Sequence, residues 1–189
     1  MRLKMMVAGL AMGMCVAAVA QHADEGTTSP AKALDVMLTQ YEKDAVPTAK
    51  AMPADKYDFA PSGTTFADKS PATFEKVRTF GAQVAHVAQA NYYFFMLVSG
   101  LKPDVDIRAL DKMTKKDDAV KALEGSIAFG HKAIATITSA NAFQTIKGAD
   151  GMNTRTTLAA FAVAHGYDHY GQMVEYLRMN GIVPPSSAK

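Results

Sequence analysis

Cysteine is nearly absent from this sequence. The 189 residues include one, Cys15, and it lies in an N-terminal segment that we expect to be removed from the mature protein. A mature chain without cysteine can form no disulfide and carries no thiol nucleophile of its own. Thiol chemistry would therefore need a thiol from a second substrate.

An excess of charge of one sign is also absent. The chain has 20 basic and 18 acidic residues, and the loss of Arg2 and Lys4 with the N-terminal segment leaves equal numbers. A balanced chain lacks the electrostatic footprint of proteins that bind nucleic acid or anionic lipid. We therefore expect no nucleic-acid partner.

No apolar run is long enough for a comfortable membrane span. The run from Met5 to Ala17 follows a short basic start, and the small residues Ala18-Val19-Ala20 come directly after it. This order is typical of a secretory signal peptide. We predict that residues 1–20 are a signal peptide cleaved after Ala20. The mature protein would be periplasmic or secreted, with no membrane association after cleavage.

Strand signals are missing, and helix signals take their place. There is no sustained alternation of apolar and polar residues and no Asn-Gly turn. Residues 21–29 are small and polar and predict a flexible mature N-terminus. Residues 30–189 predict one all-α domain, a four-helix bundle. The expected helices span 30–51, 71–99, a third that opens with a capping box at 114–117, and a fourth from 153–154 to 180.

The most informative motif is His165-Gly166-Tyr167-Asp168-His169. Both histidines lie on the apolar stripe of the fourth predicted helix, so we expect them to face the interior. Two imidazoles four residues apart on a helix can reach one metal ion. The alternative is two separate core histidines, each hydrogen-bonded to a neighbour. Glycine at position 166 argues against a zincin protease, which needs glutamate there.

A third ligand is needed, because catalytic zinc sites commonly use three protein ligands. Beyond His22 in the N-terminal tail, the candidates are His86 and His131. His86 lies opposite the strongest apolar stripe of its helix, on a second uncharged face. His131 lies at the edge of the stripe of the third helix. The spacing alone does not decide between them.

Two stretches of the chain resemble the DinB/YfiT-like family. Residues 165–172, HGYDHYGQ, continue into 176–185, YLRMNGIVPP, and resemble the final helix of that family. Residues 80–92, FGAQVAHVAQANY, resemble its second helix. The resemblance extends in order and spacing over essentially the whole mature chain.

The resemblance implies a metal site and a topology. In that family one histidine of the second helix joins an H-x-x-x-H pair of the fourth to hold a divalent metal. Carried over residue by residue, the ligands are His86, His165 and His169, and His131 has no counterpart. The family fold is an up-down-down-up four-helix bundle, often dimeric, with zinc, nickel, iron or a similar ion at one end of the core.

The resemblance says less about the reaction. Characterised members include S-transferases and isomerases that use low-molecular-weight thiols, and many members have no assigned activity. We expect a metal-dependent enzyme, transferase-like or hydrolytic, with a small-molecule substrate and a low-molecular-weight thiol as candidate co-substrate. One alternative is a non-enzymatic metal-binding or stress-related bundle with a structural ion. Another is a helical interaction module without metal.

The second predicted helix carries apolar residues on nearly all of its faces. The core of a single bundle would bury only part of this apolar surface. Such a helix is buried on all sides or meets a partner. We therefore predict a homodimer. The alternative is that the loops 52–69 and 101–113 cover the excess apolar face.

Overall fold

A computed structural model describes residues 28–65 and 73–188. The predicted signal peptide and nearly all of the predicted flexible N-terminus lie outside the described residues. The first helix, α1, spans Pro30–Ala51 as predicted. Ser29 caps it by accepting a hydrogen bond from the Lys32 amide at 3.1 Å, and Pro30 occupies the first helical position. Both are strong helix-start signals. The first-turn amides of a helix have no partner within the helix, so a serine oxygen that accepts from one of them is favourable, and proline has no amide hydrogen that would need a partner.

Helix α2 begins later than predicted. It spans Phe80–Ser99, and Thr79 caps it, whereas residues 73–79 are not helical. The predicted start signal at 70–71 lies outside the described residues. The amides of Phe80 and Gly81 donate to carbonyls of Phe59 and Tyr57, both at 2.8 Å. The start of α2 is therefore tied to the segment that follows α1.

Helix α3 spans Lys116–Ile134, and helix α4 spans Arg155–Met179. The capping box predicted at 114–117 is wrong, because α3 is preceded by Lys115 without a side-chain cap. The start of α4 is as predicted. Thr154 and Thr157 cap each other's backbone amides there in a capping box.

A small hairpin occupies the loop that was expected to be irregular. Strands β1 (Thr145–Ala149) and β2 (Met152–Thr154) pair antiparallel around Asp150 and Gly151. Both turn residues have positive φ, 50° and 79°, which is the requirement of a type I′ turn. Asp-Gly is a recognised hairpin signal, so the sequence did contain the information.

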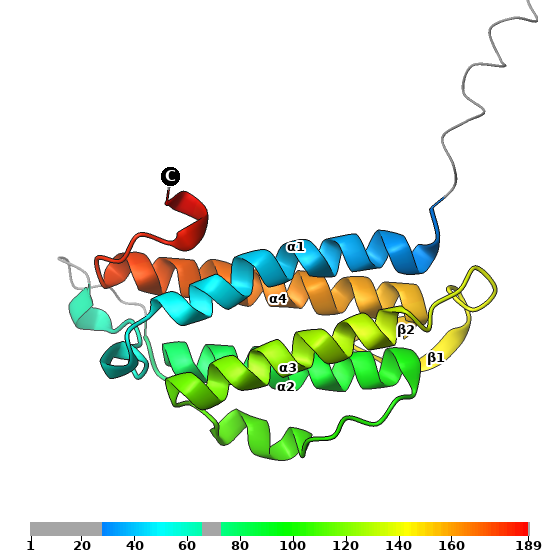
Figure 1. The fold of residues 1–189 in the computed structure, drawn as a ribbon. Helices are drawn as coiled ribbons and strands as arrows, with labels where there is room; N and C mark the ends of the chain where they lie inside the picture. The colour runs from blue at the N-terminus through cyan, green and yellow to red at the C-terminus, as the bar shows by residue number, and fades with distance from the viewer. Residues whose placement is uncertain (1–27, 66–72, 189) are drawn as a thin grey trace, which may run out of the picture.

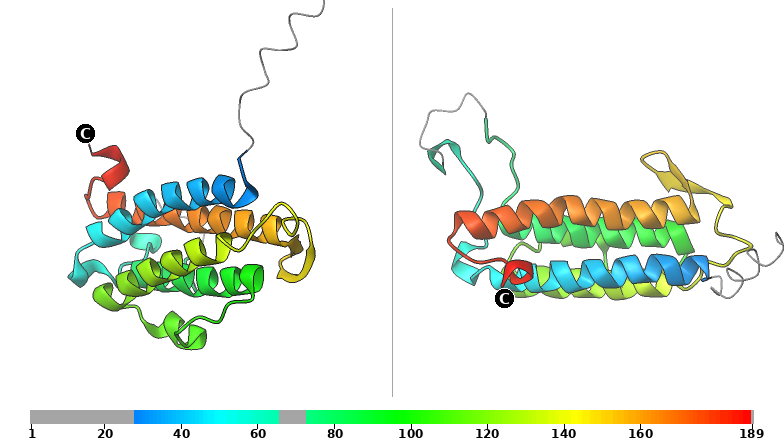
Figure 2. Two further views of the ribbon diagram at one scale, coloured as in Figure 1. Left: turned by 45° about the vertical axis from the view of Figure 1, so that its right-hand side comes forward. Right: turned by 90° about the horizontal axis from the view of Figure 1, so that it is seen from above.

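The four helices form the predicted bundle. Helix α1 packs on α3 and α4, and α2 packs on the same two helices from the other side. The colour gradient in Figure 1 shows that α1 and α4 run one way while α2 and α3 run the other, which is the up-down-down-up order. The views of Figure 2 show the four axes side by side and the hairpin at one end. No helix among the described residues is long and apolar enough to span a membrane.

The segment between α2 and α3 covers part of the apolar surface of α2. Its 3-10 helix η3, Ile107–Lys112, packs against α2 and buries Leu110. Gln89 of α2 donates to the Ile107 carbonyl at 3.1 Å. One of the two loops named as possible covers therefore does cover α2. The homodimer stays a prediction.

Candidate metal centre

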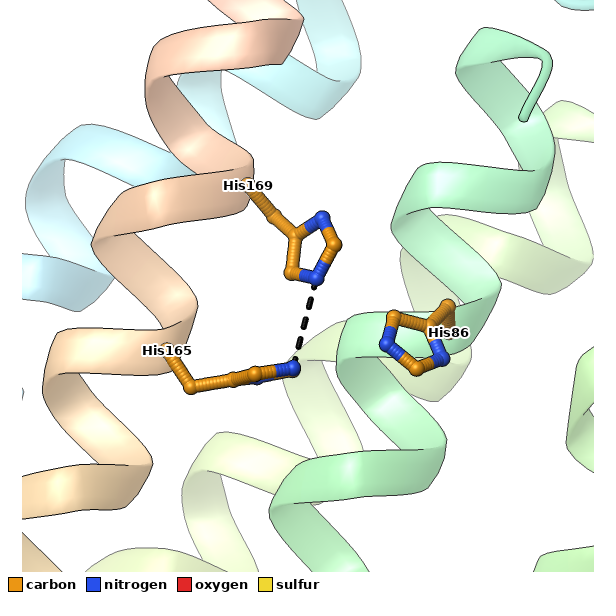
Figure 3. A group of neighbouring side chains, drawn as sticks. All are labelled: His86, His165 and His169. Carbon is orange, nitrogen blue, oxygen red and sulfur yellow. Dashed lines mark hydrogen bonds between the residues drawn. The ribbon is translucent and has the colours of Figure 1, made fainter. Parts of the chain in front are cut away.

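Helix α4 presents His165 and His169 toward α2. They lie one turn apart near the middle of the helix, and their Nε2 atoms are 3.3 Å apart. His169 is only 6% exposed, and His165 is half-buried. Figure 3 shows both rings directed into the space between the two helices. The spacing of the motif produces this convergence, because residues four apart share a helix face.

Helix α2 supplies the third ring. The His86 ring centroid lies 4.8 Å from that of His169 and 5.3 Å from that of His165. Each of the three histidines offers a nitrogen within 4.8 Å of the others. His86 lies within the first two turns of α2 and the pair lies near the middle of α4, so the cluster lies between these two helices.

Gln83 orients one of these rings. Its side chain is 2% exposed, and its Oε1 lies 2.6 Å from Nδ1 of His169. A glutamine oxygen only accepts, so His169 must carry its proton on Nδ1 and keep a lone pair on Nε2, which faces the other histidines. This residue was not predicted from the sequence. Its position one turn before His86 was the available signal.

The hydrogen bonds continue from Gln83 to the surface. Gln83 donates to Oε1 of Gln172 at 2.7 Å, and Gln172 donates to Oδ2 of Asp168 at 3.0 Å. All the hydrogen bonds in this series run in the same direction, since each glutamine accepts through its oxygen and donates through its nitrogen. Asp168 therefore acts at a distance from the site, through two glutamines. Such outer partners fix the orientation of metal-ligating histidines.

The surroundings keep the histidines neutral. Burial first, then the charge of Arg78 and the neighbouring His165, lowers the pKa of His86 to about 4. Burial and the two other histidines lower the pKa of His169 to about 4, and burial also lowers the pKa of His165. Neutral imidazole is the form that binds metal.

The donor set fits a divalent ion. Two nitrogens bound to one tetrahedral zinc at about 2.0–2.1 Å lie about 3.3–3.4 Å apart, which matches the 3.3 Å between the two Nε2 atoms of α4. Nδ1 of His165 is buried and has no hydrogen-bond partner within the described residues. Nε2 is the His165 atom beside His169, so an ion held by the two Nε2 atoms would leave this Nδ1 without a partner. Three imidazoles suit zinc, nickel, copper or iron.

The other histidine that the sequence offered as a third ligand lies elsewhere. His131 is half-buried on α3, and its ring contacts Asp35 and Glu42 of α1 at 2.5 and 3.4 Å. It plays no part in the cluster.

We expect replacement of Gln83 by leucine to weaken metal binding by about 10–100-fold, the usual effect of losing an outer hydrogen-bond partner. Metal affinity measured with a competing chelator tests this. Gln89→Leu is the matched control, because Gln89 lies on the same helix but bonds Ile107. Gln83→Glu retains the acceptor and should restore most of the affinity. Equal affinities in both leucine variants would contradict the role.

We expect the metal-free protein to lose stability as the pH falls from about 6.5 to about 4. The unfolded histidines titrate near 6.5, whereas His86 and His169 titrate near 4 when folded. Between these values the unfolded state binds more protons than the folded state, so the free energy of unfolding decreases as the pH falls. Allowing for solvent screening at the half-exposed His86, we expect a fall of about 2 kcal/mol. Urea unfolding across this range measures it, and the His86→Gln/His169→Gln double variant should show a flatter profile.

Comparison with known proteins agrees with the fold and the cluster. The family model described as the DinB superfamily matches residues 37–173, which include all three histidines. No curated protein matches the chain. Because the match extends over most of the sequence and the bundle has the order of helices that the resemblance implied, the chain belongs to the DinB superfamily.

Proposed function

We propose that this protein is an exported metal-dependent enzyme in which His86, His165 and His169 hold one divalent ion. The observation that carries the proposal is the convergence of three neutral imidazoles within 4.8 Å. Within residues 28–65 and 73–188, no carboxylate or fourth histidine joins them. Three protein ligands leave a position for water or substrate, which is the pattern of catalytic sites, whereas structural zinc sites are closed by four.

An ion bound there would lower the pKa of a coordinated water or thiol and so provide a nucleophile at neutral pH. The protein's own residues have separate roles. Gln83 holds the proton on Nδ1 of His169, so that its Nε2 stays available. Phe94 and Phe161 pack against the His165 ring, with centroids 5.6 and 6.2 Å away, and limit water on that side.

The charge near the site favours an anionic ligand. Arg78 precedes α2, and its positive charge contributes to the lowered pKa of all three histidines. A fixed cation attracts a thiolate or carboxylate to the same place. The predicted mature chain has no cysteine, so a thiolate must come from a co-substrate. This is compatible with a thiol-dependent transferase, and hydrolysis by a metal-activated water is the second candidate reaction.

Cobalt substitution separates an enzyme from a protein with a structural ion. We expect the visible spectrum of the cobalt-loaded protein to change when a small thiol is added, because the thiol takes the open position. Metal-loaded protein is then assayed with small thiols and electrophiles, and with ester and amide substrates. A spectrum that no thiol or competing anion alters would show a closed site and favour the structural ion.

Export is the second part of the proposal. It rests on the basic start, the apolar run and the small residues at 18–20. We expect N-terminal sequencing of the protein from the periplasm or medium to begin at Gln21. Recovery of the chain in the cytoplasm with residues 1–20 attached would contradict export.

A further inference from the structure

A cavity of about 710 Å³ lies between the 101–113 segment and α3. Its lining comes from that segment, from α3 and from one residue of α2, Tyr92. None of the three clustered histidines lines it. The volume is in the range of small-molecule sites, so this cavity requires an explanation separate from the metal centre.

Tyr92 gives the cavity a polar group without a partner. The residue is 4% exposed, and its hydroxyl makes no hydrogen bond within the described residues. A side chain at position 125 would not fit beside it, because a Cβ there would lie 2.7 Å from the Tyr92 oxygen. Gly125 therefore leaves the hydroxyl open toward the cavity. The hydroxyl is therefore accessible from the cavity, where a ligand can form a hydrogen bond with it.

The charges around the cavity are mostly negative. Four carboxylates and one ammonium, Lys121, line it. Glu124 is paired with Lys50 at 2.6 Å, and Asp106 caps η3. Asp104 and Asp118 make no ion pair among the described residues. Burial and then the charge of Asp104 raise the pKa of Tyr92, which places this carboxylate within electrostatic reach of the hydroxyl.

The rest of the lining is apolar and partly open. Leu110 is buried, whereas Val105 and Met113 are 37% and 38% exposed. Large apolar side chains around a concave surface, with a few polar groups, are the usual composition of a ligand site. The carboxylates favour a positively charged ligand, and the apolar residues favour a ligand with an apolar chain or ring.

We propose that this cavity binds a small organic cation, a protonated amine carried on an apolar chain or ring. The ammonium would lie between Asp104 and Asp118 and donate to the Tyr92 oxygen. The apolar body would pack against Val105, Leu110 and Met113. The site is independent of the metal centre and of the reaction proposed for it.

The test compares octylammonium with octanoate, which has a similar apolar chain and the opposite charge. Both are titrated by calorimetry into the mature protein at low ionic strength. We expect octylammonium to bind at least about tenfold more tightly, because the charge interactions are screened least at low salt. Equal affinities, or no octylammonium binding at millimolar concentration, would overturn the proposal.

Variants locate the bound cation. Tyr92→Phe removes only the hydroxyl and should weaken octylammonium by about three- to tenfold. The Asp104→Asn/Asp118→Asn double variant should weaken it by a similar or larger factor. Asp111→Asn/Asp117→Asn is the matched control, because it removes two exposed carboxylates from η3 and α3 that do not line the cavity. We expect the control to bind within twofold of the parent.

Two further outcomes would also overturn the proposal. If the two double variants weaken binding equally, the loss of affinity comes from the change in net charge and not from the loss of a specific site. If chelation of the metal abolishes octylammonium binding, the ligand sits at the histidines. Light scattering is run alongside the titrations. Association of two chains that is lost with Tyr92→Phe, without cation binding, would assign the cavity to a second copy.

Discussion

We expect His169→Ala to purify with almost no bound metal, whereas the parent protein carries close to one ion per chain. The side chain supplies an Nε2 lone pair that Gln83 fixes in position. Its loss leaves two imidazoles, which is too few for a tight site. The affinity should fall by more than the 10–100-fold that an outer partner contributes. His165→Ala should behave in the same way, and elemental analysis of the purified proteins measures both.

Stability provides an independent readout of the same variants. An ion that binds only the folded state adds about 4 kcal/mol at a free concentration one thousand times its Kd. We therefore expect zinc to raise the unfolding temperature of the parent and not of His165→Ala or His169→Ala. His131→Ala is the matched control, because its ring contacts Asp35 and Glu42 away from the cluster. Equal metal content in all four proteins would refute the site.

Helix boundaries were predictable where the cap is local. Ser29-Pro30 and Thr154 are start signals in the sequence, and the structure has helices beginning at those places. The start of α2 also has a local cap, Thr79, but the predicted helix began at residue 71, and the first amides of α2 bond to Phe59 and Tyr57 from a distant segment. A pairing between residues more than twenty apart leaves no periodic signal.

The site was predictable in part for a similar reason. The histidine pair of α4 lies on one helix, so its spacing is visible. His86 lies on α2, which is buried on nearly all sides. Because apolar residues occur on all faces of this helix, the pattern does not show which face points toward α4. The resemblance to a family, and not periodicity, selected it over His131. Gln83 became recognisable only when the structure placed it against His169.

Glycine at position 166 has a structural reason that the motif alone does not reveal. Residue 166 faces away from the metal cluster and against α1. A Cβ there would lie 2.6 Å from Cζ of Tyr41, whose side chain is fully buried and also packs on the Tyr167 ring. Any side chain at this position would push α4 from α1. The glycine that argues against a zincin motif is therefore part of the packing between these two helices.

We expect Gly166→Ala to lower the free energy of unfolding by about 1–2 kcal/mol. Alanine gains about 1 kcal/mol of helix propensity, but overpacking a closed core costs about 1–3 kcal/mol or more. The contact with the Tyr41 ring leaves little space for relaxation, so the second effect should exceed the first. The melting temperature should fall by about 2–8 °C.

Gly171→Ala is the control for that prediction. Gly171 lies on the same helix, is exposed, and has nothing within 4 Å of an added Cβ. This variant should therefore gain about 1 kcal/mol from propensity alone. In a Tyr41→Leu background the clash is removed, so adding Gly166→Ala should cost little or become favourable. If Gly166→Ala destabilises both backgrounds equally, the Tyr41 contact is not the reason that this position is glycine.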